Sequence, residues 1–191
     1  GHLGALAHGQ VTTGVIKIAG IGASALAASA LVGSKATSVS GKAADLALNT
    51  VLIAGTANLA NLLDLRPGRA LKATVLVATP LSYFSAAAAK PEASASGASA
   101  QRLLASGLNA AAITALVEDL QETTMLGDTG ANAAGALLGT SLAANDSWKL
   151  RLGATLGVVG LILASEKVSF SKVIAANPAL NWLDQLWRRP L

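Results

Sequence analysis

Residues 45–64, DLALNTVLIAGTANLANLLD, decide the fold. Between Asp45 and Asp64 lie 18 residues without a charge. A membrane-spanning helix needs about 20 mostly apolar residues, with a range of about 17 to 25. The stretch shows no regular apolar–polar alternation and is dominated by Ala and Leu, so it favours a helix over a strand. We therefore predict a membrane helix here.

The same spacing of charges recurs along the chain. Five further charge-free gaps of 14 to 17 residues lie between successive charged residues. Charged side chains at helix ends can extend to the membrane surface, so most of these gaps are long enough for a crossing. We predict an all-α, polytopic membrane helix bundle in which residues 1–191 form a single membrane domain. Its six hydrophobic helices are expected at roughly 11–33, 43–63, 69–89, 101–118, 130–145 and 150–166.

Composition supports this class of protein. Hydrophobic residue types make up 52% of the 191 residues and charged types 13%, about half of the roughly 25% usual in soluble domains. This balance excludes intrinsic disorder, and the absence of cysteine excludes a disulfide scaffold. The net charge of +4 comes from scattered bases without a basic run, so we expect no nucleic-acid partner.

A soluble alternative stays open. Residues 16–25, IKIAGIGASA, imitate a strand followed by a dinucleotide-binding glycine turn, which would fit an α/β domain. The nearest later acid is Asp45, which does not follow in a second strand, so we interpret these glycines as helix-packing residues. A soluble Ala-rich helical bundle is the other form of this alternative.

Small residues and tryptophans fit membrane helices. Gly135-x-x-x-Gly139 and Gly153-x-x-x-Gly157 have the spacing that lets two helices approach closely.

With six crossings, segments 1–10, 64–72, 118–129 and 166–191 share one side, and 90–101 is an external loop. The shared side carries eight Lys and Arg against six, so we expect it to be cytoplasmic. The tryptophans lie outside the apolar cores, as interfacial residues do: Trp148, Trp182 and Trp187.

Polar residues at the end of the second predicted helix form the first candidate cluster. Asn58, Asn61 and Asp64 follow an i, i+3, i+6 spacing, which places them within an arc of about 120° and over about 9 Å of a helix. Residues 67–68, Pro-Gly, then end the helix, and Arg66 and Arg69 lie beside it. Ordinary helix capping and interhelical hydrogen bonding remain the alternative interpretation.

The second cluster is residues 125–132, MLGDTGAN. Asp128 and Thr129 stand where a helix N-cap is expected, and capping alone is one interpretation. The other is chemical, because a helix N-terminus suits phosphate and an adjacent carboxylate suits a divalent cation. Two predicted helices separate Asp64 from Asp128, so both clusters should lie on the same membrane face.

At these residues the chain resembles the polyprenyl-phosphate N-acetylhexosamine-1-phosphate transferase family, the glycosyltransferase family 4-like membrane enzymes of peptidoglycan, teichoic-acid and O-antigen synthesis. Asn58, Asn61 and Asp64 resemble the family motif Asn-x-x-Asn-x-x-Asp-Gly. Residues 126–130, LGDTG, resemble its Met-Gly-Asp-x-Gly-Ser motif, and 12–17 resemble the helix start of bacterial members. The resemblance implies transfer of a sugar-1-phosphate from a UDP-sugar to polyprenyl phosphate, with release of UMP.

The resemblance also implies site residues and surroundings. Asn61 and Asp128 would be Mg²⁺ ligands, and Asp64 and Asp128 would be the catalytic carboxylates. Asn58 and Asp64 would support binding of the nucleotide. Arg66 or Arg69 could contact phosphate, an inference that we draw from charge alone. We expect a multi-pass protein of the bacterial plasma membrane with a cytoplasmic active face; a homodimer is compatible with this.

The chain departs from the family pattern at three points. Residues 65–68, LRPG, stand where a second acid is usual, the late His-rich loop has no counterpart, and no paired-Asp motif precedes Asp45. His2 and His8 are interpreted as loop residues. The only Met is Met125, so we expect the C-terminal part of a longer transferase. A non-catalytic relative that binds nucleotide-sugar or lipid intermediate, and a small transporter, remain the alternatives.

Overall fold

The computed structural model describes residues 13–87 and 95–188, and within them it is all-helical without a strand. The predictions for segment 1–10, for His2 and His8, and for the start of the loop at 90–94 concern residues outside the described ranges. The helices are α2 (Thr13–Val32), α3 (Val39–Leu63), α4 (Arg69–Ala87), α5 (Ala95–Leu120), α6 (Gly127–Ala143), α7 (Trp148–Ser165), α8 (Phe170–Ala176) and α9 (Pro178–Gln185).

The prediction of an all-helical chain is confirmed, and the α/β alternative is wrong for the described part. The stretch 16–25 lies inside α2 instead of forming a strand and a turn. Within residues 13–87 and 95–188, four helices are long and apolar enough to cross a membrane: α2, α3, residues Ser99–Leu120 of α5, and α7. The predicted helices 69–89 and 130–145 exist as α4 and α6, but neither is among those four.

Four of the described helices begin earlier than predicted. Helix α3 begins at Val39 and not at 43, and α7 begins at Trp148 and not at 150, each after a serine whose side chain caps it. Helix α5 begins at Ala95, so the C-terminal half of the expected loop 90–101 is helical. Ala has the highest helix propensity, and no Pro follows Pro91 in that segment to stop the helix. Helix α6 begins at Gly127, three residues before the predicted start, because Asp64 and Asp119 accept hydrogen bonds at its beginning.

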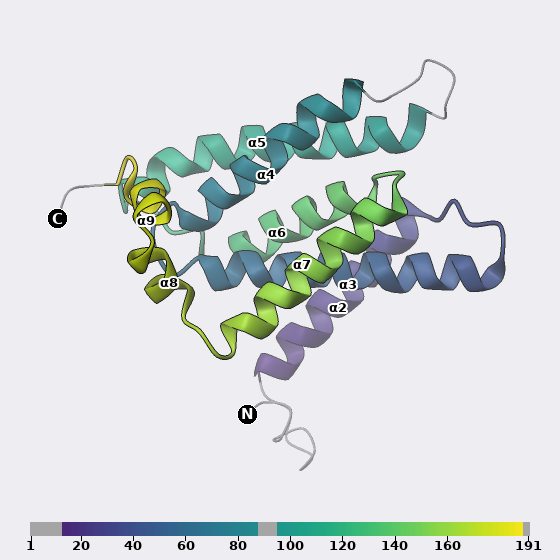
Figure 1. The fold of residues 1–191 in the computed structure, drawn as a ribbon, viewed down its shortest axis with the longest axis horizontal. Coiled ribbons are helices and arrows are strands. Elements are labelled where there is room, and N and C mark those ends of the chain that lie inside the picture. Colours follow the sequence, from purple (N-terminus) through teal and green to yellow (C-terminus); the bar gives the residue numbers. More distant parts are fainter. Residues whose placement is uncertain (1–12, 88–94, 189–191) are drawn as a thin grey trace, which may run out of the picture.

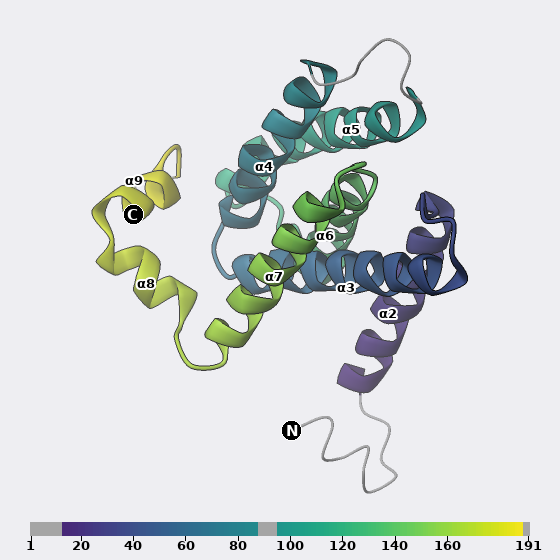
Figure 2. The ribbon, with the colours of Figure 1, turned by 45° about the vertical axis from the view of Figure 1, so that its right-hand side comes forward.

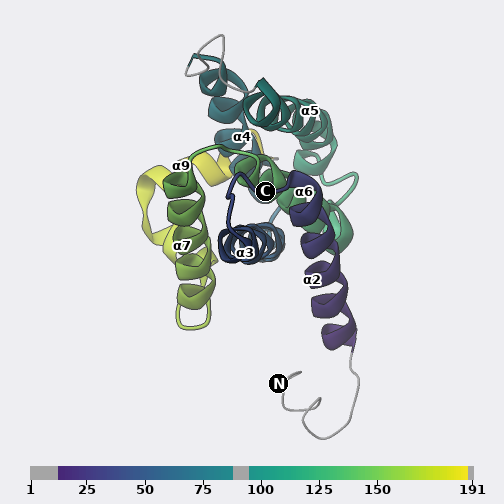
Figure 3. The same ribbon diagram turned by 90° about the vertical axis from the view of Figure 1, so that its right-hand side faces the viewer.

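Helix α3 is the central element of the bundle. It packs against α6, α2 and α7, and Figure 3 shows it nearly end-on between α7 and α2. Helices α4 and α5 pair with each other and lie over α6 (Figure 2). The core gathers small and branched side chains from these helices, with Leu52, Ile53 and Ala78 almost fully buried. The site residues considered below come from the ends of α3, α5 and α6 and from α2, with the turn that follows α3.

Glycines set the closest contact in the bundle. A side chain at Gly135 would meet the carbonyl of Thr56 at 2.5 Å, and one at Gly139 would meet Cα of Ile53 at 2.8 Å. The pairing of 135 with 56 and of 139 with 53 makes α3 and α6 antiparallel. The Gly135–Gly139 spacing therefore serves helix packing as predicted. Gly153 and Gly157 have nothing within 4 Å of such a side chain, so this second pair does not pack within the described chain.

The last two helices close one end of the bundle. Figure 1 shows α8 and α9 at the left end, beside the start of α4. This end also holds the C-terminus of α3 and the N-terminus of α6. We call it the site end, and we call the opposite end, with the turns α2–α3 and α6–α7, the far end.

Candidate functional site

The two candidate motifs meet at the site end. Asp64 directly follows α3, and Gly127 is the first residue of α6. Because α3 and α6 are antiparallel, these two points are neighbours, and the Gly127 N–H donates a hydrogen bond to the Asp64 carboxylate. Gly127 has φ +65°, a left-handed conformation that favours glycine. The expectation that both motifs share one end of the bundle agrees with this contact.

The Asp64 carboxyl lies among other acids. Burial first, and then the charge of Asp119, raise the pKa of Asp64 to about 6, and Asp128 adds a smaller contribution in the same direction. The hydrogen bond from Gly127 opposes this rise without cancelling it. A carboxyl with such a pKa carries a proton part of the time near neutral pH. Burial is thus the main reason why this carboxyl holds its proton, and the neighbouring acids add to the effect.

Asp119 ties the two motifs together, and the sequence did not identify it as a site residue. It is the residue before the last of α5, and its side chain is buried. One carboxylate oxygen accepts from the N–H of Gly68 at 2.6 Å, and the other accepts from the N–H of Leu126 at 3.2 Å. Asp119 thereby holds the turn after Asp64 and the loop before Asp128 in one arrangement.

Asp128 is not the N-cap of α6, so that interpretation is wrong. Leu126 occupies the cap position and makes no side-chain cap hydrogen bond. Carboxylates from other helices, Asp64 and Asp119, accept from the first N–H groups instead, which is why α6 can start early. The Asp128 side chain is 75% exposed and forms a 3.0 Å ion pair with Lys17 of α2.

Three asparagines accompany these acids. Asn58 and Asn61 are half-buried on the last two turns of α3. Asn132 donates from Nδ2 to the carbonyl of Asp128 at 2.6 Å. The Oδ1 atoms of Asn61 and Asn132 are buried and accept no hydrogen bond from the described residues. Both are amide oxygens with unused acceptor capacity close to the carboxylates.

The two arginines of the first motif have different surroundings. Arg66 is exposed and forms no ion pair with the described residues. Arg69 is 6% exposed, and its guanidinium donates two hydrogen bonds to Asp184 of α9 and a third to Ser171 of α8. This set of partners argues against Arg69 as a phosphate ligand, because its donors already serve to attach the C-terminal helices.

A groove between α2 and α6 begins beside this site. Its volume is about 520 Å³, and it runs from Lys17 and Asn132 towards Ala28 and Thr140. Most of its other lining side chains are aliphatic: Ile21, Ala25, Ile53, Ala57, Ala136 and Leu137. It offers an apolar space whose charged end lies at the Lys17–Asp128 pair.

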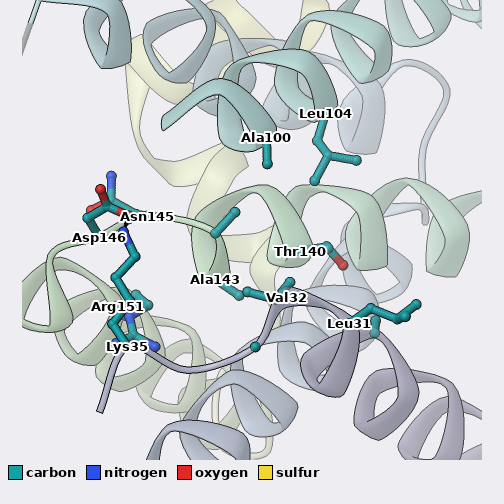
Figure 4. Close-up of a pocket in the computed structure, with 13 residues that line it drawn as sticks. Leu31, Val32, Lys35, Ala100, Leu104, Thr140, Ala143, Asn145, Asp146 and Arg151 are labelled. Atoms are coloured by element: carbon teal, nitrogen blue, oxygen red, sulfur yellow. Dashed lines mark hydrogen bonds and ion pairs between the residues drawn. The ribbon is translucent and has the colours of Figure 1, made fainter. Parts of the chain in front are cut away.

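A second cavity marks the far end. It encloses about 440 Å³ and is lined by residues of α2, α5, α6 and α7. Figure 4 shows Asn145, Asp146 and Arg151 gathered on one side and Leu31, Leu104 and Thr140 on the other. Its charges are matched in pairs: Lys35 with Asp146, and Arg151 with Asp45 at 2.9 Å.

Within residues 13–87 and 95–188, no group of three or more His, Cys, Asp or Glu side chains could hold a metal ion by itself. A metal at the site end would thus depend on one or two carboxylates, amide oxygens and external ligands. Searches with this chain found no matching family model, curated protein or solved structure. The functional argument therefore rests on the geometry of the site and on the motifs.

Proposed function

We propose that this chain is the C-terminal part of a Mg²⁺-dependent transferase that moves a sugar-1-phosphate from a UDP-sugar to polyprenyl phosphate. The observation that carries the proposal is the meeting of Asp64 with the N-terminus of α6 at Gly127. Two motifs more than 60 positions apart in the sequence supply carboxylates, an amide oxygen and helix N–H groups to one end of an apolar bundle. These are the groups that a metal–diphosphate substrate requires.

The residues present fit Mg²⁺. The buried Oδ1 of Asn61 has no hydrogen-bond partner among the described residues, and the Asp64 carboxyl, whose pKa is raised by burial and by Asp119, forms no ion pair with them. Mg²⁺ is usually bound by one or two carboxylates with waters and substrate phosphates, so a small protein ligand set suffices. Asn61 and Asp128 would hold the ion, and bound Mg²⁺ would neutralise charge on the diphosphate.

The helices around the site support a six-span arrangement. Helix α4 has 19 residues and α6 has 17, which correspond to about 28 Å and 26 Å of helix against about 30 Å of hydrocarbon. Each lies between two helices that are apolar enough to cross, and α6 packs antiparallel along α3. We propose that both cross, which places the site end on one membrane face, the cytoplasmic one by its excess of Lys and Arg.

The groove along α2 suits the lipid substrate. Lys17 lies at its mouth, where an ammonium can attract the phosphate of polyprenyl phosphate, and the aliphatic walls can cover the first isoprene units. Lys17 is now held by Asp128 at 3.0 Å, so cation binding at Asp128 would release Lys17 for that phosphate. A lipid phosphate bound at Lys17 would lie close to Asp128, one of the proposed metal ligands.

Asn58, Asp64 and Arg66 are the residues that we propose to bind the nucleotide. Asn58 and Asp64 line the last two turns of α3, and exposed Arg66 follows them with a guanidinium that forms no ion pair in the described part. In the reaction, an oxygen of the lipid phosphate bonds to the β-phosphorus of the UDP-sugar, and the bond from that phosphorus to the α-phosphate oxygen breaks. UMP leaves with the electron pair. Arg66 would stabilise the negative charge on UMP, and Asp128 and Asn61 would orient the diphosphate.

The test uses two aspartates that both pair with a lysine, one at each end of the bundle. Full-length protein should release UMP from UDP-N-acetylhexosamine in the presence of polyprenyl phosphate and Mg²⁺. Asp128→Asn at the site end should abolish UMP release, whereas Asp146→Asn at the far end should leave it within about twofold of wild type. Equal activity of the two variants, or no UMP from wild-type protein with any UDP-sugar offered, would contradict the proposal.

A non-catalytic relative is the second candidate, and one observation favours it. The described residues contain no group of three acids able to hold a metal, and the sequence lacks the second acid of the first motif. Such a protein would bind UDP-sugar or lipid without releasing UMP. Retention of radiolabelled UDP-N-acetylglucosamine by protein that yields no UMP, with loss of retention in Asn58→Ala, would identify this function instead.

A further inference from the structure

Three cations surround a single carboxylate where α9 docks on the start of α4. Arg69 donates to both oxygens of Asp184, at 2.7 and 3.0 Å, and Nη1 of Arg188 lies 3.9 Å from the same carboxylate. The Lys72 ammonium donates to the carbonyls of Leu183 and Asp184, at 3.1 and 2.8 Å. Arg69 and Lys72 are almost fully buried. One negative charge therefore faces three positive charges.

This cluster has unused donors. The Nε of Arg188 is buried and donates to none of the described residues, and Lys72 uses two of its three N–H donors. Burial alone would raise the pKa of the Asp184 carboxyl, but Arg69, Arg188 and Lys72 hold it below its ordinary value. An unpaired buried donor costs free energy, so an added anion would be stabilised here.

An apolar pocket adjoins the cluster. It has a volume of about 210 Å³ and lies between α4 and the pair α8–α9. Besides Arg69, Lys72 and Asp184, its lining is almost entirely aliphatic: Leu63, Ala73, Leu76, Ile174, Leu180 and Leu183. A surplus of positive charge next to a leucine-lined pocket suits a ligand with an anionic head and a hydrocarbon tail.

The position of the pocket indicates where such a ligand comes from. The apolar span α7 ends at Ser165, and α8 and α9 follow directly at the end of the bundle (Figure 1). Trp182 is 65% exposed and Trp187 is 73% exposed, and tryptophan favours the boundary between hydrocarbon and headgroups. Exposed Lys167 and Lys172 lie on the same segment. The pair α8–α9 is therefore at headgroup level.

We propose that the pocket between α4 and α8–α9 binds an anionic phospholipid. Lys72 and Arg188 receive the headgroup phosphate, and an acyl chain lies against Leu76 and Leu180. The bound lipid fastens the two C-terminal helices to the bilayer surface and completes the charge balance around Asp184. The proposal does not depend on the transferase reaction, because it concerns residues that bind neither UDP-sugar nor Mg²⁺ there.

Lipid-specific quenching of tryptophan tests the site. A full-length Trp148→Phe protein leaves Trp182 and Trp187 as reporters in nanodiscs of phosphatidylcholine. Brominated phosphatidylglycerol should quench their fluorescence at lower mole fraction than brominated phosphatidylcholine. Arg188→Gln should weaken the phosphatidylglycerol effect about fivefold, the value expected for one basic residue at an anionic surface. Lys149→Gln, an exposed cation at the far end, is the matched control and should change nothing.

The variants separate binding from folding. Arg188 makes only a long ion pair, so Arg188→Gln should keep the wild-type helical content. Lys72→Gln is the second variant, and it should weaken the phosphatidylglycerol effect by at least as much. Equal quenching by the two lipids, or equal effects of Arg188→Gln and Lys149→Gln, would overturn the proposal. So would full reversal of the phosphatidylglycerol effect by inorganic phosphate, which would identify a site for free anions. UMP release by Arg188→Gln should match wild type, so the two proposals fail separately.

Discussion

The two ends of the bundle differ in whether their carboxylates are paired with cations. At the far end, Asp45 accepts from Arg151, and Asp146 pairs with Lys35, so each carboxylate has its own cation. At the site end, Asp64 and Asp119 lie close enough for one to raise the pKa of the other, and neither forms an ion pair with a described residue. The same bundle thus has one end whose carboxylates are paired with cations and one end where two neighbouring carboxylates, Asp64 and Asp119, are not paired within the described residues.

The difference separates structure from function. Buried polar groups are normally paired. Buried charged or polar groups that have no partner in the protein are more often found at a site where a bound ligand pairs with them. The far-end cavity, about 440 Å³, is close in volume to the groove beside the site, about 520 Å³, yet its charges are matched. The site end has carboxylates, a free amide oxygen and helix N–H groups. Charge imbalance, and not cavity size, is therefore the better guide to the site.

The largest expected effect tests the far end. Asp45→Ala removes the carboxylate that accepts from Arg151, whose buried guanidinium then keeps only the neutral Oδ1 of Asn49 as a side-chain acceptor among the described residues. An uncompensated buried charge costs about 3–5 kcal/mol, so the free energy of unfolding in detergent should fall by about that amount. Ser40→Ala, at an exposed position on the first turns of α3, is the control. A loss below about 1 kcal/mol in Asp45→Ala would show that water already solvates Arg151.

The next effect tests the residue that joins the two motifs. Asp119→Ala leaves the N–H groups of Gly68 and Leu126 without acceptors, at a cost of about 1–3 kcal/mol for each. We expect a loss of about 2–5 kcal/mol in chemical unfolding. Glu118→Ala removes an adjacent but exposed acid and should stay within about 0.5 kcal/mol of wild type. Equal losses in the two variants would contradict the arrangement.

Helices α2 to α7 could be predicted from the sequence because their signal is local, whereas the short helices α8 and α9 were not predicted. Charge-free gaps mark α2 to α7, and the order of the gaps predicts that Asp64 and Asp128 share one end. The partners could not be predicted, because they depend on which helices touch. Nothing around Asp119 or Asp184 distinguishes them from ordinary helix-end acids until α5 meets the turn at Gly68 and α9 meets Arg69.

The start of α6 shows the same limit. A cap is expected within the local sequence, and Asp128 and Thr129 are the residues that could provide it. The structure caps α6 with Asp64 and Asp119, which come from α3 and α5. The placement of the two polar clusters at one end of the bundle was thus predictable from the sequence, whereas the surroundings of Asp128 and Arg69 required the contacts with Lys17 and Asp184.

A smaller effect on stability has the opposite sign and tests the buried carboxyl of Asp64. The folded pKa of Asp64, about 6, lies above its ordinary value, so the folded state holds the proton more tightly than the unfolded state. The stability from this group is fully present below about pH 4 and is lost as pH rises through about 6. Asp64→Asn should remove this loss, so the variant should melt at a higher temperature than wild type at pH 7. Thermal unfolding from pH 4 to pH 8 measures this, with Asp146→Asn as the control; a variant less stable than wild type at pH 7 would contradict it.

The smallest effect compares the two exposed ion pairs, Lys17–Asp128 and Lys35–Asp146. Both join α2 or its following turn to α6 or its following turn, one at each end of the bundle. Exposed pairs contribute about 0–1 kcal/mol, so Asp128→Asn and Asp146→Asn should each change the free energy of unfolding by less than that. Their stabilities should agree while their UMP release differs, because only Asp128 lies beside unneutralised carboxylates. If Asp128→Asn lost several kcal/mol, its inactivity would follow from unfolding, and the contrast between a structural end and a functional end would no longer hold.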